Sequence, residues 1–257
     1  MKQLDAIHAI SSIIRNDKAV RALFLKGSIA RGIFDEYSDV DFYCLVHSDQ
    51  MEEFLTRRRA YLEQYRPLLA IFDEDFVAPQ VVAVFDNGLH FDLYTVTEDT
   101  LRYTQGIKIL YDPEKVLDKP NPENFEVDEN EFLQYFDEFS LILLEFEAAY
   151  MRNDYIWASR LGSHLCGVLA LILRHVYDSK NAKFGFKRLS DVLEDEILNK
   201  MSKAMDNLGP SHLPEGVIQL IEITDEVIKK LSKDISDKIN KNFFYLMKKK
   251  IYNLSEE

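Results

Sequence analysis

Five residues near the N-terminus have types and spacing suited to binding a metal-complexed phosphate. Gly27 and Ser28 follow a short apolar run, and Asp39 and Asp41 open the next one. Glycine permits close approach of a ligand to the backbone, and a short helix carrying Arg31 would offer free N–H groups to a phosphate. Residues i and i+2 of a strand point to the same face, about 6.6 Å apart, so their two carboxylates can close on one Mg²⁺. The segment predicts a site for phosphate and magnesium.

A third carboxylate, Asp92, lies in the apolar run 89–96, where His90 and Tyr94 share its predicted strand face. A charged side chain inside such a strand is costly unless a metal or a polar partner compensates it. If the two strands are neighbours, three aspartates converge beside the phosphate-binding turn. That geometry suits phosphoryl transfer, in which metal ions neutralise the triphosphate and a carboxylate takes a proton from the attacking hydroxyl. We interpret His90 as a neighbour of this site and not as a catalyst.

Hydrophobic periodicity predicts the elements that must position these residues. The N-terminal part alternates between helical and strand periods, with expected strands at 20–25, 40–46, 68–72, 80–85, 89–96 and 108–111. The Asp86-Asn87-Gly88 sequence predicts a hairpin between two of them, because Asn-Gly tolerates positive φ. A mixed sheet with flanking helices is expected over residues 1–111.

The rest of the chain has a different character. Residues 112–129 hold three prolines and several acidic residues, a composition typical of a linker. Only helical patterns follow, at 130–152, 154–178, 187–206, 214–232 and 235–253. We therefore predict an α+β protein in which a catalytic domain (1–111) is followed by an all-α helical bundle domain (130–257).

Composition limits the partners of the chain. It has 257 residues and a formal net charge of −13, which disfavours general binding to nucleic acid or to an anionic membrane. Cys44 and Cys166 lie in apolar contexts and suit a reduced, cytoplasmic protein. The N-terminus has no signal-peptide pattern, and the longest apolar run, 167–173, is too short to span a membrane. We expect no nucleic-acid partner and no membrane association.

The motif Gly27-Ser28-x-Ala30-Arg31-Gly32, followed by Ser38-Asp39-Val40-Asp41, resembles the signature of the polymerase-β-like nucleotidyltransferase superfamily. Within it, the chain looks most like the bacterial antibiotic nucleotidyltransferases, and the greatest similarity is to the lincosamide nucleotidyltransferases with a helical C-terminal domain. The aminoglycoside adenylyltransferases are similar in plan. The resemblance implies transfer of a nucleoside monophosphate from an Mg²⁺-bound NTP to a hydroxyl of a small molecule, with release of pyrophosphate. Lincosamides and aminoglycosides both carry basic amines, which agrees with an acidic protein.

The resemblance also implies roles for individual residues. Gly27 and Ser28 would hold the β- and γ-phosphates, and Arg31 would be a weaker candidate for phosphate contact. Asp39 and Asp41 would ligate Mg²⁺.

The identity of the general base stays open at this point. Asp92 would be a third metal ligand, the base, or both. In some relatives a glutamate of the helical domain is the base instead, and Glu145 and Glu147 lie at plausible positions. Related enzymes often form homodimers, so a homodimer is a further expectation.

Two alternatives use the same residues. The chain could transfer a nucleotide to a protein or an RNA, as in a toxin–antitoxin system, although the acidic charge disfavours RNA. It could also be a catalytically silent nucleotide-binding module, which the presence of all three aspartates disfavours.

Overall fold

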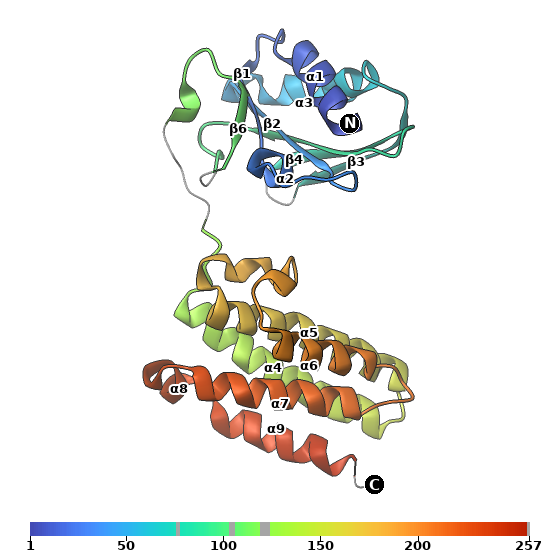
Figure 1. Cartoon of the computed structure of the whole chain (residues 1–257), viewed down its shortest axis with the longest axis vertical. Coiled ribbons are helices and arrows are strands. Elements are labelled where there is room, and N and C mark those ends of the chain that lie inside the picture. The colour runs from blue at the N-terminus through green and yellow to red at the C-terminus, as the bar shows by residue number, and fades with distance from the viewer. Residues whose placement is uncertain (76–77, 103–105, 119–123, 256–257) are drawn as a thin grey trace. The chain divides into compact units, whose positions relative to one another are not determined.

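The computed structural model of the protein describes residues 1–75, 78–102, 106–118 and 124–255. The chain forms two compact units, Met1–Glu123 and Asn124–Glu257 (Figure 1). Part of the predicted linker, residues 119–123, lies outside the described residues. The boundaries at 111 and 130 therefore stay a prediction.

Unit 1 is built on a mixed sheet, as predicted. Its six strands lie in the order β3-β4-β5-β2-β1-β6. Their bounds are β1 Val20–Leu25, β2 Val40–Val46, β3 Leu68–Asp75, β4 Pro79–Phe85, β5 His90–Val96 and β6 Lys108–Tyr111. The pair β2–β5 is parallel, and the other described pairs are antiparallel. The predicted hairpin joins β4 to β5, with Gly88 at φ +69°.

The two faces of the sheet differ in chemistry. Helices α1 (Lys2–Ile14) and α3 (Met51–Glu63) cover one face, where Val40, Phe42 and Cys44 of β2 are fully buried (Figure 1). The opposite face carries the alternate residues of the same strands, including Asp41, Tyr43 and Asp92. The period-two reading of β2 and β5 is confirmed, because the residues expected in the core are there.

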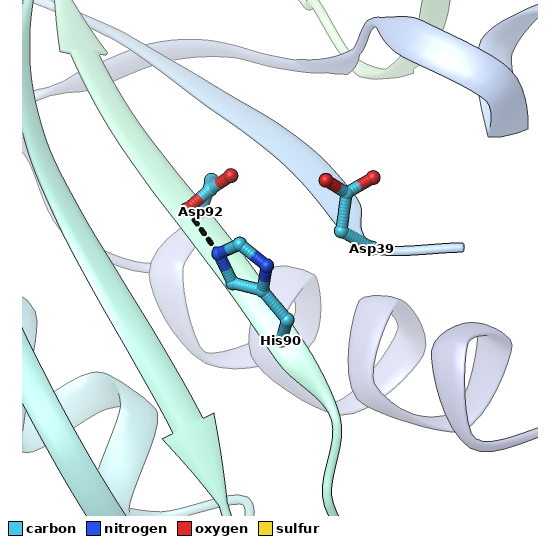
Figure 2. A group of neighbouring side chains, drawn as sticks. All are labelled: Asp39, His90 and Asp92. Carbon is cyan, nitrogen blue, oxygen red and sulfur yellow. Dashed lines mark hydrogen bonds and ion pairs between the residues drawn. The ribbon is translucent and has the colours of Figure 1, made fainter. Parts of the chain in front are cut away.

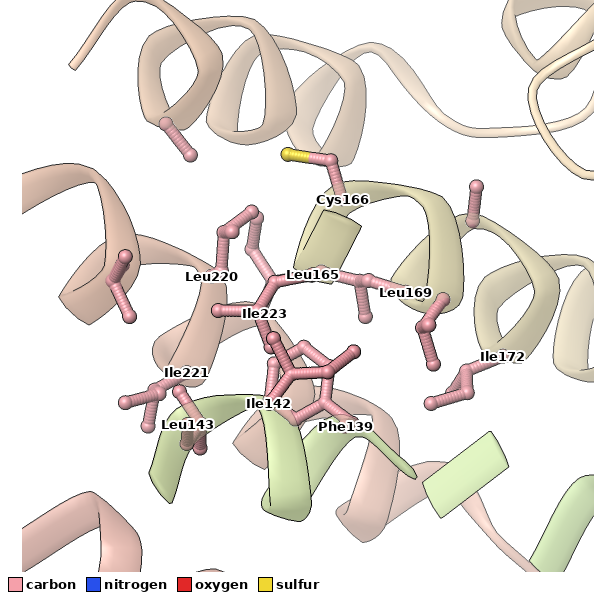
Figure 3. Close-up of a cluster of buried hydrophobic side chains, with 14 of the residues drawn as sticks. Phe139, Ile142, Leu143, Leu165, Cys166, Leu169, Ile172, Leu220, Ile221 and Ile223 are labelled. Atoms are coloured by element: carbon pink, nitrogen blue, oxygen red, sulfur yellow. The ribbon is translucent and has the colours of Figure 1, made fainter. Parts of the chain in front are cut away.

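Unit 2 is entirely helical in its described regular structure. Its α-helices are α4 Glu129–Met151, α5 Tyr155–Tyr177, α6 Asp195–Asp206, α7 Glu215–Lys230, α8 Lys233–Lys238 and α9 Lys241–Asn253. Asp128 and Glu131 form a reciprocal capping box at the start of α4. Side chains of α4, α5 and α7 fill the centre of a separate hydrophobic core (Figure 3).

Two long helices predicted for unit 2 are wrong because each is interrupted. Residues 187–194 are not part of α6. The backbone of Arg188 has the left-handed conformation, with φ +57°. The guanidinium of buried Arg174 donates hydrogen bonds to the carbonyls of Gly185 and Lys187. The predicted helix 235–253 divides into α8 and α9, because Asn240 accepts a hydrogen bond from the backbone N–H of Phe243 and starts a new helix.

One helix among the described residues, α5, is long and apolar enough to cross a membrane by length and composition. Slightly more than half of its most apolar stretch is buried within unit 2. Leu165, Leu169 and Ile172 lie in the core that Figure 3 shows. A core helix passes the same test of length and hydropathy, so α5 is accounted for by packing within this unit.

Candidate functional site

The parallel pairing of β2 and β5 brings two of the predicted aspartates together. Asp41 and Asp92 are directly opposed partners in this ladder, and Tyr43 and Tyr94 are the next pair on the same face. The convergence of the aspartates was predicted only for the case that the two strands are neighbours. They are neighbours, although 50 residues (42–91) separate Asp41 from Asp92 along the chain.

Asp39, His90 and Asp92 form a compact group on this face (Figure 2). Their nearest carboxylate oxygens and imidazole nitrogen all lie within 4.8 Å of one another. Asp39 directly precedes β2, whereas His90 and Asp92 belong to β5 (Figure 2). The group contains oxygen and nitrogen donors that suit a divalent cation.

Asp92 is the most buried member of the group, with 6% of its surface exposed. His90 Nε2 lies 3.0 Å from Asp92 Oδ1. The side chain of Gln80, at the start of β4, also hydrogen-bonds to the Asp92 carboxyl group. Burial raises the pKa of Asp92 above its ordinary value, while the charge of His90 and the Gln80 hydrogen bond oppose that shift. Asp92 is therefore a carboxylate held in a costly environment by two polar neighbours.

Asp41 approaches the turn that follows β1. Gly27 begins the short helix α2 (Gly27–Arg31) with φ +65°, and a β-carbon there would collide with Asp41 Oδ2. The backbone N–H of Lys26 donates to the carbonyl of Asp41 at 3.1 Å. The glycine is thus required both by its backbone conformation and by the neighbouring carboxylate.

Ser28 and Arg31 occupy the same short helix as expected. Ser28 is half-buried, and its carbonyl accepts from the backbone N–H of Ile33 at 3.0 Å. Arg31 is exposed, and its Nε donates to the carbonyl of Gly27 at 3.2 Å. Both residues therefore lie within one turn of helix from the Gly27–Asp41 contact.

The loop before Asp39 is held by a residue of the first helix. The amide of buried Gln3 donates to the carbonyls of Asp35 and Ser38, each at 3.0 Å, and to that of Glu36 at 3.3 Å. Within the loop, Ser38 Oγ donates to Asp35 Oδ1 at 3.0 Å. Gln3 thereby links α1 to the loop that ends at Asp39.

Aromatic rings extend the site along the same sheet face. Tyr43 stacks on Tyr94 with ring centroids 4.4 Å apart and on Phe24 at 5.0 Å. The ammonium of Lys26 lies 4.6 Å from the centre of the Tyr43 ring. Burial, and then the negative charges of the three aspartates, raise the pKa of Tyr94 far above its usual range. Tyr94 is therefore a neutral phenol under any ordinary condition.

The glutamates considered as alternative bases belong to unit 2. Glu147 is paired with Lys250 of α9 at 2.8 Å. Glu145 lines a small pocket of about 270 Å³ together with Arg152, Asp154 and Trp157. Within unit 1, Asp92 gathers with the predicted ligand Asp39, and the choice of the base between Asp92 and a glutamate of unit 2 stays a prediction.

Three residues of the site were missed or undervalued from the sequence. Its position in the sequence predicts His90 only as a neighbour of the site, yet it is a member of the donor group. Gln80 and Gln3 were not singled out. A signal existed for Gln3, because it lies at helical spacing from Ile7, Ile10 and Ile14 on an otherwise apolar face. A polar residue on such a face needs a buried partner.

Comparison with known proteins gives the family. The family model described as "Streptomycin adenylyltransferase" matches residues 1–254. Among solved structures, an aminoglycoside 6-adenyltransferase from Bacillus subtilis is 15% identical, with 95% of this chain and 97% of that chain covered and a TM-score of 0.40. No curated protein sequence matches significantly. The extent of the family match shows that this chain belongs to the streptomycin adenylyltransferase family and is a nucleotidyltransferase.

Proposed function

We propose that the protein transfers AMP from Mg²⁺-bound ATP to a hydroxyl of an aminoglycoside-like small molecule and releases pyrophosphate. The observation that carries the proposal is the group Asp39, His90 and Asp92, with Asp41 opposite Asp92 and beside Gly27. The family's description favours an aminoglycoside over a lincosamide. The net charge of −13 also favours a cationic acceptor.

The donor set fits a divalent cation. Asp39, Asp41 and Asp92 would supply oxygen ligands, which Mg²⁺ prefers. When bound, Mg²⁺ supplies positive charge that neutralises the triphosphate. Gly27 and Ser28 would bind the β- and γ-phosphates through the backbone turn, and the lack of a side chain on Gly27 lets the Asp41 carboxylate lie against that turn.

Asp92 would act as the general base. The acceptor oxygen forms a bond to the α-phosphorus, the bond from that phosphorus to the bridging oxygen breaks, and pyrophosphate leaves. The proton of the acceptor hydroxyl passes to Asp92. In the metal-free site, burial raises the pKa of Asp92, a shift in the direction that favours proton acceptance.

The test is a pyrophosphate-release assay with untagged protein, ATP and Mg²⁺. Streptomycin, other aminoglycosides and a lincosamide are offered separately, and mass spectrometry looks for an acceptor that has gained one AMP. We expect release with at least one aminoglycoside and none without an acceptor. Release with only a lincosamide, or transfer of AMP to a protein or RNA, would contradict the proposed acceptor class.

Two variants separate the site from general damage. Asp41→Asn removes a proposed ligand, whereas Asp49→Asn changes an exposed aspartate that follows β2. We expect the first to abolish release and the second to leave it unchanged. A homodimer and a cytoplasmic location stay predictions.

A further inference from the structure

The donor group on β2 and β5 contains an imidazole as well as carboxylates. Resting on the proposed metal-dependent function, we infer that His90 is itself a metal ligand and that the site binds first-row transition ions such as Co²⁺ and Mn²⁺ through its nitrogen. The expected consequence is tighter binding of these ions than of Mg²⁺. The inference concerns which cations this chain selects, beyond the transfer reaction.

The donor atoms of His90 and Asp92 are separated by the distance expected of two ligands of one ion. His90 Nε2 and Asp92 Oδ1 are 3.0 Å apart. Two adjacent ligands of an octahedral ion with bonds of about 2.1 Å are separated by about 3.0 Å. The two atoms are therefore already spaced as neighbouring ligands of one ion. Asp39 completes the group, with its nearest oxygen within 4.8 Å of both.

The side chains of His90 and Asp92 differ in how freely they can move. His90 has 47% of its side chain exposed, so its ring can turn toward an ion that arrives from solvent. Asp92 is held differently, because buried Gln80 also hydrogen-bonds to it. Loss of the imidazole would thus leave Asp92 with a polar partner, and a variant at position 90 should keep the fold of the site.

The imidazole of His90 binds transition ions better than it binds Mg²⁺. Mg²⁺ takes oxygen ligands and gains little from an imidazole, whereas first-row transition ions bind imidazole well. Affinity for mixed nitrogen and oxygen sites rises from Mn²⁺ to Co²⁺ and further along the series. A site with three carboxylates alone would show a weaker preference, because carboxylate oxygens also suit Mg²⁺. His90 therefore enlarges the selectivity for the transition ions.

An alternative role for His90 is only to orient Asp92 through their hydrogen bond. A positioning residue of that kind would affect every cation that Asp92 binds. A ligand would affect the ions that favour nitrogen and would add its nitrogen to the spectrum of the bound ion. The two roles therefore differ in measurable ways.

The experiment uses the untagged full-length protein and binding measurements, without turnover. Calorimetry gives the affinities for Mg²⁺, Mn²⁺ and Co²⁺, and pulsed electron paramagnetic resonance of bound Mn²⁺ detects coupling to ¹⁴N. We compare wild type with His90→Gln and with His8→Gln, which changes an exposed histidine of α1. Circular dichroism checks that each variant is folded.

We expect ¹⁴N coupling in the wild type and in His8→Gln and its loss in His90→Gln. Co²⁺ affinity should fall about tenfold or more in His90→Gln, since even groups that only support a ligand contribute that much. Mg²⁺ affinity should change far less. Equal weakening of all three ions, or wild-type Mn²⁺ without nitrogen coupling, would overturn the inference. Because no acceptor is present, a failure of the transfer assay would leave this result standing.

Discussion

The carboxylate of Asp41 fills the space that a β-carbon on Gly27 would require. This contact joins the turn after β1 to the start of β2, which are the two places where the sequence motif has its glycine and its aspartates. This geometry explains the glycine of the motif, because the turn can approach the carboxylate only where no side chain intervenes.

Gly27→Ala should therefore damage both stability and activity. Positive φ alone costs a non-glycine residue about 1–2 kcal/mol, and the collision with Asp41 adds to that cost. Gly32→Ala is the matched control, because Gly32 has φ +72° and nothing within 4 Å of the added carbon. Chemical denaturation should show loss of stability in both variants, with the larger loss and the loss of nucleotidyl transfer in Gly27→Ala. Equal behaviour of the two would refute the role of the contact.

Asp92→Asn should separate function from stability. We expect kcat to fall about 10²–10⁴-fold, the usual contribution of a general base. The free energy of unfolding near neutral pH should rise or stay level, because burial raises the pKa of Asp92 and makes its ionised form costly in the folded state.

The expected gain in the free energy of unfolding of Asp92→Asn can be checked by varying the pH. A raised folded pKa means that stability is lost as pH rises through the window above about 3.8, the ordinary value of an aspartate. The advantage of Asp92→Asn should thus be greatest above this window and vanish below it. Thermal unfolding of both proteins at several pH values measures the difference, and a variant less stable at neutral pH would contradict the assignment.

Gln3→Leu should loosen the loop that ends at Asp39. The substitution removes the amide that donates to three backbone carbonyls. Buried acceptors left without a donor cost about 1–3 kcal/mol. Calorimetric titration should show weaker cation binding, and denaturation should show reduced stability. Gln64→Leu, at a residue whose amide donates to Ala60 within its own helical turn, should change neither.

The environment of His175 predicts that the stability of unit 2 depends on pH. Its Nδ1 lies 3.1 Å from the carbonyl of Val127, and its ring is 4.4 Å from that of Phe132. Burial lowers the pKa of His175, and the hydrogen bond to Val127 opposes the shift. The folded state therefore takes up a proton less readily than the unfolded state. The free energy of unfolding should fall as pH decreases from about 7 toward 5.

The measurement is helical ellipticity during thermal unfolding across this pH range. His175→Gln should reduce the dependence, because the variant has no imidazole to titrate at this position. His212→Gln, at an exposed residue, should retain the wild-type dependence. An identical pH response in all three proteins would assign the effect to other groups.

Local patterns in the sequence predicted much of unit 1. The bounds of β1, β2 and β6 agree with the structure. The faces of β2 and β5 follow from strict alternation. The pairing of these strands did not follow, since which strands become neighbours depends on contacts between distant parts of the chain.

The roles of His90 and the interruption before α6 required three-dimensional information. Alternation placed His90 on the correct face, but its 3.0 Å approach to Asp92 depends on side-chain torsions that no spacing fixes. The break near Arg188 involves buried Arg174, which donates to the carbonyl of Lys187, an acceptor that a helix continuous from residue 187 would use itself. Helical periodicity carries no signal of such competition.

The parallel ladder between Asp41 and Asp92 has a consequence for folding. Asp41 of β2 and Asp92 of β5 meet only after residues 42–91 have closed into a loop. An unfolded chain therefore has no preformed cation site. Binding to the folded form alone shifts the folding equilibrium by mass action. Added cation should therefore raise the melting temperature of unit 1, whereas unit 2, which has its own core, should melt as before. The melting temperature of unit 1 would then report how much cation is bound at the sheet.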